Sequence, residues 1–203
     1  MADANPDALI KRVRRLIATA DRWRGSAEKV LYWARCSLKD PGASEFNDRA
    51  YNFVDRCFMI HEHKNNHSKI ENDLRRIKTV FRGMAKFYAD VKAHGGYICC
   101  GPPIGPGDNA YAQIGGYHKG DKTGITFVYA KCRTWNNTEL TDLTTHESVH
   151  FAGNIGHAQI GGRTAYSNAA FRLSNAKALK NASSYTWLTY LAQMPHSRWL
   201  TAT

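Results

Sequence analysis

The chain has 203 residues, of which 43% are hydrophobic and 22% charged, and its formal net charge is +11. This length allows one domain with a sizeable core, and no apolar run reaches the roughly 18 residues that predict a transmembrane helix. The positive charge favours anionic partners, namely nucleic acid, an anionic cell-surface polymer or an acidic protein. Nucleic acid is the least favoured of these, because no nucleic-acid-binding motif accompanies the charge.

The N-terminal segment and the cysteines bear on the compartment. Residues 1–24 are amphipathic and basic, without the apolar core and cleavage site of a secretory signal. We therefore expect either a protein that is cytoplasmic before export by a route needing no such signal, or a mature or excised domain. The five cysteines include no CxxC pair, which argues against a thiolate zinc site. Cys99 or Cys100 could pair with Cys132 in an oxidising compartment, or all could stay free.

The first half of the chain predicts helices. Apolar residues recur at helical spacing over residues 9–17, and Ser26 could cap a second helix. Pro41-Gly42 breaks the pattern before a third helix over 46–59. A long fourth helix over 70–91 is expected to stop at Gly95-Gly96.

The second half mixes strands and helices. Residues 97–100, 111–117 and 125–129 read as short strands, and a Gly- and Pro-rich loop follows the first of them. Residues 138–152 return to helix with Thr138 as its cap, and further helices are expected over 165–173 and 184–191. The simplest account is a single α+β domain over 1–203, with a helical part at 1–95 and a catalytic part at 96–203 that contains a small β-sheet.

His146-Glu-Ser-Val-His150 is an HExxH motif. Residues four apart on a helix share one face, so both imidazoles can bind one cation. Two histidines and a third protein ligand leave a zinc position open for water, and zinc lowers the pKa of that water. Glu147 would then serve as the general base that activates the zinc-bound water for attack on a peptide carbonyl. The motif therefore predicts a Zn²⁺-dependent peptide hydrolase.

The third ligand must be sought beyond the motif. No Asp or Glu follows Glu147, and His157 and His196 are the only histidines after His150. His157 lies seven residues beyond His150, after two glycines, which resembles the HExxHxxGxxH arrangement of metzincins with one residue added. We favour His157 and rank His196 second. Upstream ligands stay open, and the alternatives there are His118, Asp121 and Asp142.

A second group of histidines stands outside this motif. His61, His63 and His67 lie within seven residues, in a polar segment between two predicted helices. No glutamate follows His63 as it would in HExxH. We interpret this segment as a solvated interhelical turn that could bind a metal occasionally.

From about residue 97 onward the chain resembles the aspzincin peptidases, that is, deuterolysin and the peptidyl-Lys metalloendopeptidases. The residues that carry the resemblance are the string 146–151, the segment Gly162-Arg-Thr-Ala-Tyr166 and the segment Asn181-Ala-Ser-Ser-Tyr185. The resemblance implies a zincin-like fold with an HExxH helix and edge strands above the site. It also implies that Tyr166 stabilises the oxyanion, with Tyr185 as a weaker candidate.

The chain departs from the family pattern at two places. The second motif of the family carries an aspartate ligand, whereas the nearest position here is Arg163. His157 would then replace that aspartate. The substrate-pocket segment of the Lys-selective members carries acidic residues, whereas Ser183 and Thr186 stand at the matching positions, with Tyr185 between them. A preference for lysine is therefore not expected.

Three functions follow from these patterns. The first is a secreted zinc metalloendopeptidase that hydrolyses proteins or peptides. The second is a hydrolase of peptidoglycan peptide crosslinks that acts as an antibacterial toxin or effector, with an immunity protein as its partner in the producing cell. The third is a basic, non-enzymatic binding module on a peptidase fold, which the missing aspartate motivates and the intact Glu147 argues against.

Overall fold

A computed structural model describes residues 3–160 and 163–199. The fold is α+β and mostly helical, as expected, with one small three-stranded sheet. The chain divides into two compact units. One contains the residues up to 22 and 82–155, and the other contains 23–81 and the residues from 156 on. Each unit thus contains residues from both the helical part, 1–95, and the later part, 96–203. The boundary between the units therefore differs from the boundary expected after residue 95.

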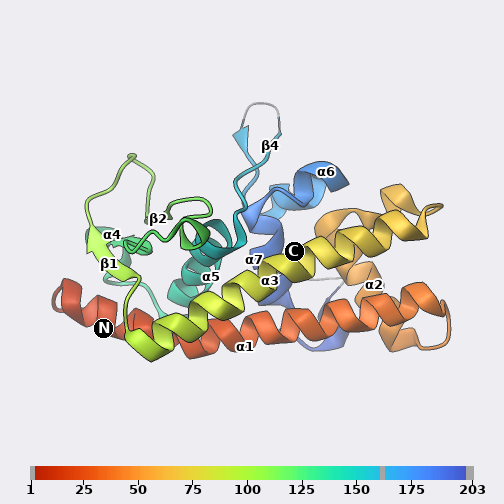
Figure 1. Ribbon diagram of the computed structural model, residues 1–203, viewed down its shortest axis with the longest axis horizontal. Helices are drawn as coiled ribbons and strands as arrows, with labels where there is room; N and C mark the ends of the chain where they lie inside the picture. The colour runs from red at the N-terminus through yellow and green to blue at the C-terminus, as the bar shows by residue number, and fades with distance from the viewer. Residues whose placement is uncertain (1–2, 161–162, 200–203) are drawn as a thin grey trace. The chain divides into compact units, whose positions relative to one another are not determined.

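Two long helices supply residues to both units, α1 (Pro6–Lys39) and α3 (His67–His94) (Figure 1). The expectation of two helices within residues 9–39, with Ser26 as a cap, is wrong. The buried stripe continues through Ala27, Val30 and Ala34. Gly25 lies inside the helix, where a glycine costs only about 1 kcal/mol relative to alanine, and the packing of the apolar stripe outweighs this cost.

The first unit contains the sheet. Strand β3 (Ile125–Val128) lies in the centre, parallel to β1 (Ile98–Gly101) and antiparallel to β2 (Ala110–Ala112). All four residues of β3 are buried, as befits a central strand. Its register depends on Gly124, because a Cβ there would lie 2.1 Å from the carbonyl oxygen of Tyr97. The third predicted strand thus forms the centre of the sheet.

Helix α5 (Asn137–Gly153) packs against β2 and β3 within the same unit (Figure 1). The expected strand over 111–117 shortens to β2, and a 3₁₀ turn, η2 (Tyr117–Lys119), follows. A short helix, α4 (Tyr129–Cys132), connects β3 to the segment before α5. The rings of Phe87 and Phe151 meet edge to face at 5.2 Å and form part of the core under the sheet.

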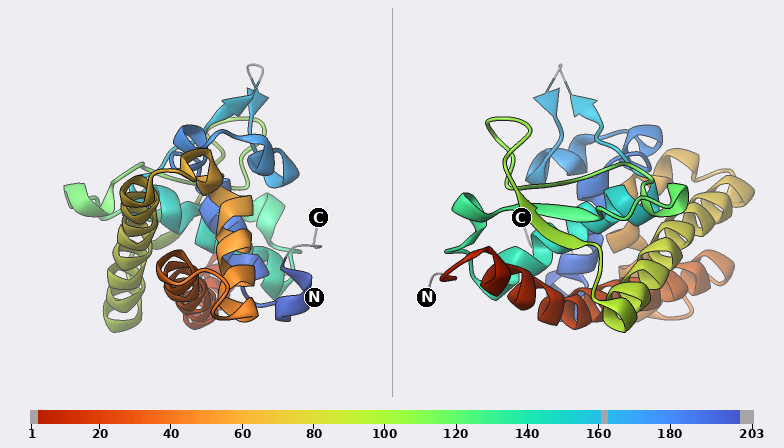
Figure 2. Two further views of the ribbon diagram at one scale, coloured as in Figure 1. Left: turned by 90° about the vertical axis from the view of Figure 1, so that its right-hand side faces the viewer. Right: turned by 60° about the vertical axis from the view of Figure 1, so that its left-hand side comes forward.

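The second unit is helical. Helix α2 (Glu45–Phe58) leads into η1 (Ile60–His63), and α7 (Ala182–Leu191) packs against α2. Its other elements are the hairpin of β4 (Gln159–Ile160) and β5 (Arg163–Thr164), drawn as neighbouring arrows in Figure 2, together with η3 (Ser167–Arg172), α6 (Asn175–Ala178) and η4 (His196–Arg198). The helix expected over 165–173 is therefore a 3₁₀ segment preceded by a strand.

Two further findings bear on the sequence-based expectations. All five cysteines are free thiols, and two of them, Cys57 and Cys132, are buried. Within residues 3–160 and 163–199, no helix combines the length and the apolar character needed to cross a membrane.

Candidate metal centre

The HExxH motif lies on α5, and the helix begins earlier than expected. Asn136 is the N-cap, and its side chain accepts a hydrogen bond from the backbone N–H of Glu139 at 3.0 Å. The Glu139 carboxylate accepts one in return from the N–H of Asn136 at 2.7 Å. This capping box satisfies two of the backbone donors that a helix start leaves free. The expectation of Thr138 as the cap is therefore wrong by two residues.

Helix α5 is buried on more than one face, although its sequence is rich in hydroxyl groups. Four of these hydroxyls donate to the carbonyl oxygen four residues earlier, at 2.5–2.8 Å; they belong to Thr141, Thr144, Thr145 and Ser148. Each buried hydroxyl is thus satisfied within the helix itself. As a result, the motif lies on a largely buried stretch of the helix, from Leu140 onward.

His146 and His150 face each other across one turn of α5. Their Nε2 atoms lie 3.2 Å apart, and their rings meet edge to face at 4.8 Å. The Nδ1 atom of His150 lies 2.5 Å from the carbonyl oxygen of Ile155, so Nδ1 carries the proton and donates it. The Nε2 atom of His150 therefore presents a lone pair towards His146, which is the tautomer that a metal ligand requires.

The end of α5 turns the chain towards the next histidine. Asn154 adopts the left-handed conformation with φ 58°, and its N–H bonds the carbonyl oxygen of Val149. Gly153 is still helical, so an asparagine and not a glycine makes the left-handed turn that ends the helix. The N–H of Gly115 donates to the carbonyl oxygen of His150 at 2.9 Å, which ties the end of the motif to the segment after β2.

His157 completes a group of three histidines. One ring nitrogen each of His146, His150 and His157 lies within 4.8 Å of the other two, and no other such group of His, Cys, Asp or Glu occurs among the described residues. His157 is only two residues past the end of the first unit and three past the α5 cap.

The three imidazole nitrogens form a donor set that could hold a divalent metal ion such as zinc. Ligand atoms about 2.0–2.1 Å from a tetrahedral zinc lie about 3.3 Å apart, and the two Nε2 atoms on α5 are 3.2 Å apart. Neutral imidazole is a preferred zinc ligand, and a carbonyl partner on the other ring nitrogen, as Ile155 provides for His150, is the usual orienting contact. Three protein ligands are typical of a zinc site that keeps one position open.

Glu147 is buried beside these ligands, with 5% of its surface exposed. Burial raises the pKa of its carboxyl to about 8, and the Asp108 carboxylate adds to this effect. A divalent cation held by the neighbouring histidines would act in the opposite direction, because positive charge favours the ionised carboxylate. The residue expected as the general base is therefore shielded from bulk water.

Tyr166 lies beside His157 in the second unit. Its hydroxyl is 3.5 Å from the Nε2 atom of His157, and the two rings meet at 4.9 Å. Tyr166 is 53% exposed, unlike a core tyrosine. The phenol ring of Tyr166 therefore lies next to His157, the expected third ligand.

Asn181 positions both of these residues, a role that the sequence did not predict. Its side chain accepts from the N–H of Ala158 at 3.2 Å and donates to the carbonyl oxygen of Ala165 at 3.1 Å. These two residues directly follow His157 and precede Tyr166. Asn181 is fully buried. A polar residue immediately before the apolar α7 was the available signal for such a bridging amide.

The upstream alternatives bond elsewhere. His118 lies with its Nε2 atom 2.7 Å from the carbonyl oxygen of Ala152, and Asp121 accepts from the N–H and the hydroxyl of Thr123. Asp142 lies one turn before His146, and burial raises the pKa of its carboxyl to about 6. None of the three belongs to the histidine group. The side chain of His196 lies outside the described part of the chain.

The three expected substrate-binding residues lie on α7. Ser183, Tyr185 and Thr186 are all buried. The hydroxyl of Tyr185 donates to the carbonyl oxygen of Leu179 at 3.0 Å, and its ring packs edge to face on Phe58. This is the packing of a core residue. A substrate-binding role for these residues stays a prediction.

No model of a known protein family matches the chain, and searches of curated proteins and of solved structures find no match either. The aspzincin resemblance thus rests on the motifs themselves.

Proposed function

We propose that the chain is a zinc-dependent endopeptidase of the zincin-like kind. The observation that carries the proposal is the 3.2 Å separation of the His146 and His150 Nε2 atoms, with His157 within 4.8 Å of both. Glu147 directly follows His146 and is buried in the same helical turn. It is the carboxylate that such an enzyme needs as its general base. A site that serves only structure would be closed by four protein ligands and has no need of this carboxylate.

The zinc ion would be held by His146, His150 and His157. When bound, it supplies Lewis-acid polarisation of a water molecule and of the scissile carbonyl group. The Glu147 carboxylate takes a proton from the attacking water and then delivers it to the leaving nitrogen of the peptide. Burial strengthens this proton transfer, because the carboxylate is not solvated by bulk water.

Tyr166 is the proposed oxyanion donor. Its hydroxyl, 3.5 Å from His157, can donate a hydrogen bond to the negative charge that develops on the carbonyl oxygen. Asn181 acts as a positioning residue, because its amide bonds the backbone next to both His157 and Tyr166. An aspzincin-like enzyme would thus use a histidine in place of the aspartate ligand of that family.

The test compares wild type with Glu147→Gln. We expect both to bind about one zinc per chain, measured by plasma mass spectrometry. Cleavage of a quenched fluorescent peptide library should fall by at least about 100-fold in the variant. Glu45→Gln is a matched control, because that carboxylate is 80% exposed and lies on α2; it should leave both quantities unchanged. A well-folded wild type that takes up no zinc would point to the binding module instead.

A second candidate function is hydrolysis of peptidoglycan peptide crosslinks as an antibacterial toxin, exported by a route without a classical signal peptide. The net charge of +11 favours it, since cell walls are anionic. The same site would act, and the producing cell would need an immunity protein. Expression in the bacterial periplasm should be toxic for wild type and harmless for Glu147→Ala. Equal growth of both strains, together with intact isolated sacculi, would exclude hydrolysis of the cell wall and leave the endopeptidase as the proposed function.

A further inference from the structure

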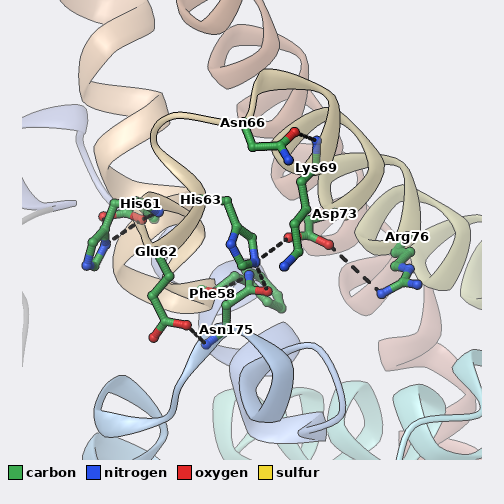
Figure 3. Close-up of polar contacts among 10 residues, drawn as sticks. Phe58, His61, Glu62, His63, Asn66, Lys69, Asp73, Arg76 and Asn175 are labelled. Atoms are coloured by element: carbon green, nitrogen blue, oxygen red, sulfur yellow. Dashed lines mark hydrogen bonds and ion pairs between the residues drawn. The ribbon is translucent and has the colours of Figure 1, made fainter.

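The histidines between α2 and α3 have different environments, although the sequence groups them. His61 is exposed, and its Nδ1 atom lies 2.8 Å from a carboxylate oxygen of Asp55. His67 is exposed at the start of α3. His63 is half-buried and points between Asp73 and Asn175 (Figure 3). The expectation of a solvated turn thus holds for the two exposed histidines and is wrong for His63.

Two side chains from two other elements of the second unit converge on His63. Its Nε2 atom lies 3.1 Å from the Oδ1 atom of Asn175 on α6 and 3.8 Å from the Oδ2 atom of Asp73 on α3. Asn175 is 3% exposed, and its amide nitrogen donates to the carbonyl oxygen of Phe58 at 2.9 Å. The amide oxygen of Asn175 is thereby turned towards His63 (Figure 3).

The Oδ2 atom of Asp73 lacks a hydrogen-bond donor among the described residues. Only 3% of the residue is exposed, and its Oδ2 atom is buried and accepts no hydrogen bond from the described residues. The guanidinium of Arg76 lies 4.0 Å from the other oxygen, but that side chain is 73% exposed and well solvated. A buried carboxylate is costly unless a positive group or hydrogen-bond donors compensate it. This position therefore calls for a positive charge close to Oδ2.

A proton on His63 does not meet this need well. The Asn175 oxygen is a pure acceptor, so the Nε2–H of His63 must point at it, and one N–H directed there is poorly aligned for Asp73 at 3.8 Å. A metal ion instead accepts lone pairs from several atoms at once. Neighbouring ligands of a first-row divalent ion lie about 3–3.5 Å apart; the 3.1 Å distance from Nε2 to Asn175 falls within this range, whereas the 3.8 Å distance to Asp73 lies just above it, so the carboxylate would move slightly closer on binding.

We propose that His63, Asp73 and Asn175 form a second site for a divalent first-row transition metal ion. An imidazole nitrogen with two oxygen donors suits Zn²⁺, Co²⁺ or Mn²⁺. The ion neutralises the buried carboxylate and fastens η1 to α3 and α6, with solvent completing its coordination. Glu62 supports the site by accepting from the N–H of Asn175 at 3.1 Å, which holds the start of α6 against η1. Its role is structural, and it is independent of peptide hydrolysis.

The experiment removes the first centre and counts what remains. A full-length His146→Ala/His150→Ala protein is titrated with Co²⁺, and binding is monitored by calorimetry and by visible absorption. We expect about one equivalent of Co²⁺ to bind and to raise the unfolding temperature. Adding Asp73→Asn should weaken Co²⁺ binding by more than about tenfold and abolish the rise. His63→Gln should do the same, which keeps the test valid if Asp73→Asn folds poorly.

The matched control is His61→Ala, since His61 lies two residues from the ligand and pairs with Asp55 instead. In the same background it should leave Co²⁺ affinity unchanged. The proposal is overturned if the background protein binds no Co²⁺ and its unfolding temperature does not move. Equal losses in His61→Ala and Asp73→Asn would overturn it as well, because they would indicate scavenging by exposed histidines.

Discussion

The Nε2 atoms of His146 and His150 lie 3.2 Å apart on successive turns of α5. Because the Nδ1–H of His150 is directed to the Ile155 carbonyl, the Nε2 atom of His150 has only a lone pair to offer. Burial lowers the pKa of His150, which favours this neutral form. Two such nitrogens share either one proton or one cation, and a third histidine within 4.8 Å favours the cation. The predictions on the metal centre rest on this relationship.

The third ligand is tested by removing it. His157→Ala should weaken zinc binding as much as His150→Ala does. The loss should exceed the roughly 10- to 100-fold that follows removal of an outer-shell partner. Competition with a chelator of known affinity measures this. His94→Ala, an exposed histidine at the end of α3, is the control and should change nothing. Full zinc affinity in His157→Ala, with a loss in His196→Ala, would transfer the assignment to His196.

The proposed role of Tyr166 concerns the rate of peptide hydrolysis and not the binding of the metal. Tyr166→Phe keeps the ring against His157 and removes only the hydroxyl. We expect kcat to fall by roughly 100-fold, while zinc content and KM stay close to wild type. Tyr32→Phe changes another exposed tyrosine, on α1, and should have no effect. An unchanged kcat in Tyr166→Phe would mean that the tyrosine only packs against His157.

The buried carboxyl group of Asp142 should make the stability of the folded protein depend on pH. Burial raises the pKa of this carboxyl to about 6, well above its ordinary value of 3.8. The folded state therefore holds the proton more tightly than the unfolded state does. The contribution of Asp142 to stability should fall as the pH rises from about 4 to about 6 and stay at the lower level above that. Asp142→Asn should raise the free energy of unfolding by up to about 3 kcal/mol at pH 7 and by nearly nothing at pH 4.

Urea unfolding of the metal-free protein at both pH values measures this difference. Asp40→Asn is the control, because that aspartate is exposed between α1 and α2. A stability gain of Asp142→Asn that is the same at both pH values would show that its carboxyl titrates normally in the folded protein.

Two helical glycines should respond in opposite directions to the same substitution. A Cβ on Gly83 of α3 would lie 2.4 Å from the carbonyl oxygen of Ala152, whereas one on Gly25 of α1 would meet nothing within 4 Å. Gly83→Ala should therefore lower the free energy of unfolding by about 1–3 kcal/mol. Gly25→Ala should raise it by about 0.5–1 kcal/mol, because alanine loses less backbone entropy. Equal effects in thermal unfolding would contradict this close approach of α3 to the end of α5.

Local sequence patterns predicted much of the fold. The apolar spacing over residues 70–91 predicted α3, and the sequence 45–58 forms α2 close to its expected place. These helices follow from contacts between residues three and four apart, which the sequence displays directly. The same local reasoning divided α1 at Ser26, because it could not weigh the packing that carries the helix past Gly25.

The sequence by itself determined the α+β class, the helix that carries the HExxH motif and the identity of its histidines and glutamate. Each of these depends on spacing along one element. Only the tertiary structure decided that Asn154 ends α5, that Asn181 ties the neighbours of His157 and Tyr166 together, and that Asp73 is buried against His63. These features depend on burial and on hydrogen bonds between distant segments, and such contacts leave no periodic signal in the chain.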